Sequence, residues 1–120
     1  MMSDVRHIHM KRIFILFLLS TTTANAREKH PYCFGIENWA TSIAYTSLKN
    51  DGVVTPETID YSKTVTKRLT SEKISKGLYK QVHHILFTLK SGATVQVITV
   101  NDASNEECSM SDVDVYVISK

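Results

Sequence analysis

Apolar and polar positions divide the chain into a short apolar block near its start and a longer region of helical and strand-like periodicity. Residues 13–19 are all apolar and follow the basic pair Lys11 and Arg12. A transmembrane helix needs roughly 20 apolar residues, so this run is too short to cross a bilayer. A basic start followed by a short apolar run is typical of a secretory signal peptide.

The residues after the apolar run support the same interpretation. Ala24 and Ala26 form the small-x-small pattern after which a signal peptidase cleaves. The sequence therefore predicts a signal peptide over residues 1–26, cleavage before Arg27, and one small domain over residues 27–120. The mature protein is expected in the periplasm or secreted, and it meets the membrane only through the signal peptide before cleavage.

From residue 33 the pattern becomes helical and ends at the stop signal of residues 50–52 (Asn-Asp-Gly). The apolar stripe, spaced by three and four residues, consists of Ile36, Trp39, Ala40, Ile43, Ala44 and Leu48. This spacing predicts one amphipathic helix, with Trp39 in the core.

The remainder of the chain alternates as strands do. A first strand is expected to place Ile59, Tyr61, Val65 and Leu69 on one apolar face. Residues 79–89, 94–100 and 113–118 follow as further strands, with turn signals at residues 75–77 and 90–93. Short sequential connections favour an antiparallel meander. The predicted fold class is α+β, with one N-terminal helix packed on a roughly four-stranded antiparallel sheet.

The mature region contains two cysteines, Cys33 and Cys108. A pair of cysteines in a small exported domain predicts a disulfide. It would tie the start of the helix to the loop before the last strand. No Cys-x-x-Cys motif supports a redox-active thiol.

Removal of the signal peptide changes the charge balance. It takes away three of 14 basic residues and one of 12 acidic residues, which leaves eleven of each and no net charge. A neutral domain lacks the concentrated basic field that nucleic-acid binding usually requires. No nucleic-acid partner is therefore expected.

The charges are nevertheless uneven, with basic residues in the middle third and acidic residues near the C-terminus. Solvated strand and loop faces account for most such charge runs, and a polarised docking surface is the sharper alternative. The candidate contact residues are Tyr32, Phe34, Lys67, Arg68, Glu106, Glu107, Asp112 and Asp114.

The sequence offers little catalytic chemistry. His83 and His84 are adjacent, so on a strand they point to opposite faces and cannot share one metal ion. The acidic residues lack the spacing of a calcium loop, and no nucleotide-binding or hydrolase motif occurs. No enzyme activity, metal or cofactor is expected, and a small hydrolase that uses His83 or His84 remains an alternative.

Two segments, residues 43–50 (IAYTSLKN) and 101–117 (NDASNEECSMSDVDVYV), resemble a group of small exported enterobacterial proteins of undefined function. Some members carry the label "Shiga toxin A subunit". The resemblance covers most of residues 33–120 and implies export, but it transfers no functional residues. Residues 90–97 also resemble a hairpin of the cholera and heat-labile enterotoxin B subunits.

These observations favour a small non-enzymatic exported protein that binds a protein or an envelope component. A toxin-like accessory or receptor-binding subunit that oligomerises through an exposed edge strand is the alternative. The sequence predicts either a monomer or a small homo-oligomer.

Overall fold

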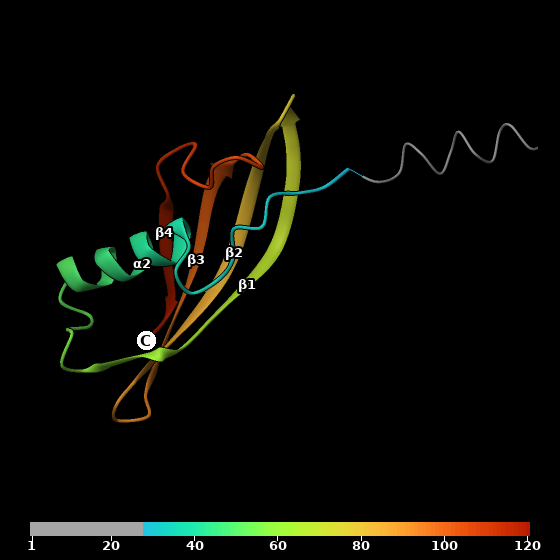
Figure 1. Ribbon diagram of the computed structural model, residues 1–120. Helices are drawn as coiled ribbons and strands as arrows, with labels where there is room; N and C mark the ends of the chain where they lie inside the picture. The colour runs from blue at the N-terminus through green and yellow to red at the C-terminus, as the bar shows by residue number, and fades with distance from the viewer. Residues whose placement is uncertain (1–27) are drawn as a thin grey trace, which may run out of the picture.

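The computed structural model describes residues 28–120, so the predicted signal peptide and its cleavage site lie outside the described residues. The chain forms one helix followed by four strands (Figure 1). The elements are α2 (Trp39–Asn50), β1 (Ile59–Ser75), β2 (Leu78–Leu89), β3 (Thr94–Ala103) and β4 (Asp114–Ser119). The strands pair as an antiparallel sheet in the order β1-β2-β3-β4. The predicted α+β meander is confirmed.

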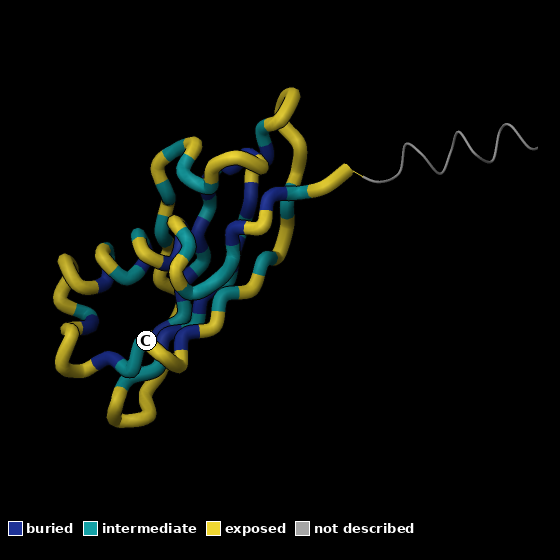
Figure 2. Tube along the Cα trace, viewed as in Figure 1, coloured by how far each residue is buried: buried dark blue, intermediate teal, exposed yellow. Residues whose placement is uncertain are grey.

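The core lies between α2 and one face of the sheet, which we call the inner face. From the helix, Ala44 and Leu48 are fully buried against Phe87 of β2 and Val97 of β3. Figure 2 shows the buried positions along the middle strands, with exposed residues at the turns and the outer surface of the helix. Side chains of strands alternate between faces, so the buried residues of β2 and β3 fall on every second position.

The helix ends where its stop signal predicts. Gly52 has a φ of 77°, a left-handed conformation that side chains with a Cβ rarely adopt. Its N–H donates to the carbonyl of Lys49 at 3.1 Å, and the next N–H, of Val53, donates to Leu48 at 2.9 Å. These bonds satisfy carbonyls that the last turn would otherwise leave without partners.

The helix begins six residues later than expected, at Trp39 instead of residue 33. The preceding segment uses its backbone for other contacts. The carbonyl of Ile36 accepts a hydrogen bond from the Tyr61 hydroxyl at 2.9 Å. The carbonyl of Gly35 accepts from the N–H of Asn38 at 3.1 Å and closes a turn. The long-range bond to Tyr61 and the local turn replace the helical hydrogen bonds that the apolar spacing predicted.

Trp39 is not a core residue, contrary to expectation. It is 36% exposed, and its indole N–H donates to the carbonyl of Ser111 at 3.2 Å. The stripe that faces the sheet is made instead by Ala40, Thr41, Ala44 and Leu48, all buried. The two alanines leave room for the helix to lie close to β3. Trp39 lies beside this stripe and binds the loop before β4.

The prediction that β1 has a single apolar face is also wrong. Ile59 is buried, but Val65 is 56% exposed and Leu69 is 49% exposed. Asp60 pairs with Thr88 and Val65 pairs with Leu86, so β1 advances five residues while β2 advances two. This odd excess of three residues reverses the alternation, because side chains repeat every two positions.

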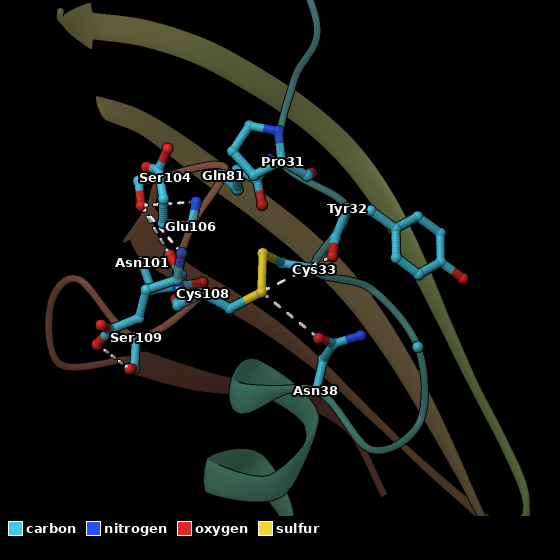
Figure 3. Close-up of a disulfide and its surroundings, with 12 residues drawn as sticks. Pro31, Tyr32, Cys33, Asn38, Gln81, Asn101, Ser104, Glu106, Cys108 and Ser109 are labelled. Atoms are coloured by element: carbon cyan, nitrogen blue, oxygen red, sulfur yellow. Dashed lines mark hydrogen bonds between the residues drawn. A yellow bond between two sulfur atoms is a disulfide. The ribbon is translucent and has the colours of Figure 1, made fainter. Parts of the chain in front are cut away.

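The disulfide between Cys33 and Cys108 is confirmed (Figure 3). It joins the segment before α2 to the loop between β3 and β4, with the two Cα atoms 5.7 Å apart. Asn101 of β3 supports this loop, because its side-chain amide donates to the carbonyl of Cys108 at 3.1 Å. Such a bond fits an oxidising compartment.

Candidate binding surface

The face of the sheet opposite α2 carries an apolar centre, and we call it the outer face. No described helix or segment packs over it, because α2 and residues 28–38 both contact the inner face. Cross-strand register places the outer-face residues in rows. The apolar members are Val65, Val82, Leu86, Ile98, Val100 and Tyr116.

Exposure is greatest at the two borders of this face. Val65 on β1 is 56% exposed and Tyr116 on β4 is 54% exposed, whereas Val82, Leu86, Ile98 and Val100 between them are half-buried by their neighbours. Large contiguous apolar surface that stays in water is uncommon in soluble proteins and marks contact sites. The outer face therefore has the composition of a docking surface.

Charged side chains lie around the apolar centre, and one polar pair, His84 and Gln96, lies inside it beside Ile98 and Leu86. Nε2 of His84 lies 2.8 Å from Oε1 of Gln96, across the β2–β3 pair. Lys80 forms an ion pair with Asp102 at 2.9 Å, toward the end of the sheet near the β1–β2 turn. Lys67 is exposed and lies beside His84 in the β1–β2 register. An apolar centre with a polar border is the arrangement that many protein interfaces share.

The structure separates Lys67 from Arg68, which the sequence grouped as one contact patch. Lys67 belongs to the outer face. Arg68 points to the inner face, where its guanidinium donates to the carbonyl of Pro31 at 2.7 Å and lies 5.1 Å from the centre of the Phe34 ring. Arg68 thus holds the segment before α2 against the sheet.

The two aromatic contact candidates, Tyr32 and Phe34, lie beside each other in the structure. The rings of Tyr32 and Phe34 have centroids 4.2 Å apart, and Tyr32 is 67% exposed while Phe34 is half-buried. They flank Cys33 on the inner-face side of the molecule (Figure 3 shows Tyr32 pointing away from the disulfide). The structure therefore does not join them to the outer face.

The acidic candidates divide into two groups. Glu106 and Glu107 are exposed in the loop between β3 and β4, where Glu107 accepts a hydrogen bond from the Ser109 hydroxyl at 2.7 Å. Asp112 precedes β4, and Asp114 pairs with Val100 at the border of the outer face. Asp114 is thus the acidic candidate that the strand register assigns to the outer face.

A row of polar side chains lies on the inner face beneath residues 28–38. His83 is fully buried, and neither ring nitrogen has a hydrogen-bond partner among the described residues. Burial, together with the nearby charge of Arg68, lowers the pKa of His83 to about 4. The side-chain amide of Gln81 donates to the carbonyl of Pro31 at 3.1 Å and to the hydroxyl of Ser71 at 2.9 Å. Gln81 anchors the segment, and His83 is shielded from solvent.

The start of residues 28–38 is held in place by charged and polar contacts of Glu28. The hydroxyl of Tyr79 donates to the carboxylate of Glu28, and Nζ of Lys73 lies 3.1 Å from that carboxylate. The hydrogen bond from Tyr79, followed by that from Lys73, lowers the pKa of Glu28. The same bond to Glu28 raises the pKa of the Tyr79 hydroxyl. These contacts hold residues 28–31 on the inner face.

Residues 28–120 contain no detected pocket and no group of three or more His, Cys, Asp or Glu side chains arranged to hold a metal ion. In the same range, no helix has the length and apolarity needed to cross a membrane.

Sequence reasoning missed most of the outer face. Its signal was present, because even-numbered positions of β2 and β3 include Val82, Leu86, Ile98 and Val100 while the odd-numbered positions are also largely apolar. A strand that is apolar on both sides is typical of a sheet that needs cover on both faces. In the described chain, only one face is covered.

Comparison with protein-family models, with curated proteins and with solved structures found no match to this chain.

Proposed function

We propose that this protein is an exported binding protein that acts through the outer face, by contact with another protein or an envelope component. The observation that carries the proposal is the uncovered apolar centre bordered by Val65 and Tyr116. Burial of apolar surface is the main driving force of most protein association, at about 25 cal/mol per Å² removed from water.

Export is part of the proposal and rests on two supports. One is the signal-like sequence of residues 1–26. The other is the disulfide between Cys33 and Cys108, which forms and persists in oxidising compartments such as the periplasm and the extracellular space.

The test compares capture by two matched variants. Oxidised wild-type protein, immobilised and exposed to envelope extract and culture supernatant, should retain a specific partner. The variant Val65→Glu should lose that partner, because it places a charge on an exposed outer-face position without disturbing the core. Tyr32→Ala alters an exposed aromatic residue away from the outer face, and this variant should still capture the partner.

Two results would count against this assignment. Equal capture of the partner by the wild type and the Val65→Glu variant would show that the outer face is not the binding site. Loss of capture with Tyr32→Ala alone would show that the partner binds at Tyr32 and Phe34, beside the disulfide. Circular dichroism of each variant checks that the fold is intact.

A further inference from the structure

The two edges of the sheet differ in how well they are protected against pairing with another strand. β1 carries the exposed lysines Lys63, Lys67 and Lys73, and its register with β2 shifts at three places. Lysines and bulges on an edge strand are the usual devices that prevent edge-to-edge association. The free edge at β1 is therefore protected against pairing with a further strand.

β4 lacks most of these devices. Its six residues, Asp114–Ser119, contain no lysine and no proline, and its register with β3 shifts once, after Val117. Tyr116, Val117 and Ile118 are 54%, 42% and 55% exposed. An exposed, apolar edge strand presents unpaired backbone N–H and C=O groups to a further strand.

The charges at the two ends of β4 indicate which strand can pair with it and in which direction. Asp112 and Asp114 stand at its start, and Lys120 follows its end. Antiparallel pairing of β4 with a second β4 brings the acidic start of each strand opposite the Lys120 of the other. Opposite charges across strands stabilise pairing and like charges oppose it, so a parallel arrangement, which sets acid beside acid, is disfavoured.

We infer that β4 pairs antiparallel with β4 of a second copy of this chain, about a two-fold axis close to Tyr116 and Val117. This contact is isologous, so it closes at a dimer. The axis runs perpendicular to the sheet, and the two outer faces therefore point the same way in one continuous eight-stranded sheet. The inference does not depend on the proposed function, since it concerns the edge of the sheet and not its face.

Sedimentation at rising concentration of the full gene product, processed in its natural host, tests the inference. The wild type should form a dimer and nothing larger. Val117→Lys places a charge at the centre of the paired edge, and we expect it to weaken the dimer by about tenfold or more. Val65→Lys changes an exposed valine on β1, at the opposite edge of the sheet, and should leave the dimer unchanged.

A charge exchange provides a second measurement that does not rely on Val117→Lys folding. Asp112→Lys/Asp114→Lys should weaken the dimer, because both ends of β4 then carry positive charge. Adding Lys120→Glu should restore it, because the complementary charges are regained with opposite sign.

Three results would overturn the inference. The first is a wild-type monomer throughout the concentration range. The second is a dimer that resists both Val117→Lys and the Asp112→Lys/Asp114→Lys change. The third is a mass that grows without limit, which would indicate that the acidic edge of β4 pairs with the basic edge of β1 in an open chain of copies.

Discussion

His83 and His84 are neighbours in the chain, yet their imidazoles lie on opposite faces of β2. His83 is fully buried on the inner face with no hydrogen-bond partner among the described residues. His84 lies on the outer face, with Nε2 at 2.8 Å from Oε1 of Gln96. The sequence predicted this separation from the two-residue period of a strand. The burial of His83 has a measurable consequence for stability.

We expect the free energy of unfolding to fall as the pH drops from 6.5 to 4. The pKa of His83 is about 4 in the folded protein and about 6.5 in an unfolded chain. Within this window the unfolded state binds more protons, so acidification favours unfolding, by on the order of 3 kcal/mol when the pH reaches 4. Urea denaturation at a series of pH values measures the effect.

His83→Leu should remove this part of the pH dependence, and His84→Leu should retain it. The two substitutions are chemically identical and affect adjacent residues on opposite faces. Identical pH profiles for both variants and the wild type would contradict a neutral, buried His83.

Arg68 and Lys67 form a second matched pair. Arg68→Ala removes the charged donor to the carbonyl of Pro31 and exposes the Phe34 ring. We expect it to lower the free energy of unfolding by roughly 1.5–3 kcal/mol, the usual contribution of a hydrogen bond to a charged group. Lys67→Ala alters an exposed outer-face residue and should change it by less than about 0.5 kcal/mol. Urea midpoints of the two variants provide the comparison, and an equal loss in both would show that the Arg68 contacts contribute little.

Loss of the disulfide should destabilise the protein strongly. Cys33 and Cys108 are separated by 75 residues, and closing a loop of this length stabilises a fold by about 4 kcal/mol in the chain-entropy model. We expect Cys33→Ala/Cys108→Ala to lose most of this amount in urea denaturation. The wild type with a reducing agent serves as the control and should match the double variant. A wild type whose stability does not respond to reduction would show that the unfolded state is little constrained by the bond.

Phe87 and Leu69 should respond very differently to truncation. Phe87 is fully buried in the core between α2 and the sheet, so Phe87→Ala is expected to cost about 3–5 kcal/mol. Leu69 lies at a register shift of β1 and is 49% exposed, so Leu69→Ala should cost less than about 0.5 kcal/mol. Thermal unfolding of both variants measures the difference. A large loss for Leu69→Ala would mean that something covers this position in solution.

The sequence by itself determined the local features of this protein. Strand alternation predicted the four-stranded meander, and the stop signal at Gly52 placed the end of the helix. Cys33 and Cys108 predicted the disulfide because the sequence contains no other cysteine. These features depend on periods and turn residues that a few neighbouring positions specify.

Tertiary structure alone decided which side chains share a surface. The helix begins at Trp39, because the carbonyl of Ile36 in the preceding segment accepts from the Tyr61 hydroxyl in place of a helical N–H group. Val65 faces outward, because β1 gains an odd number of residues relative to β2. Both effects arise from contacts between residues at least 25 positions apart or between paired strands. A local period carries no information about such contacts, so the set of side chains that share the outer face emerged only from the folded chain.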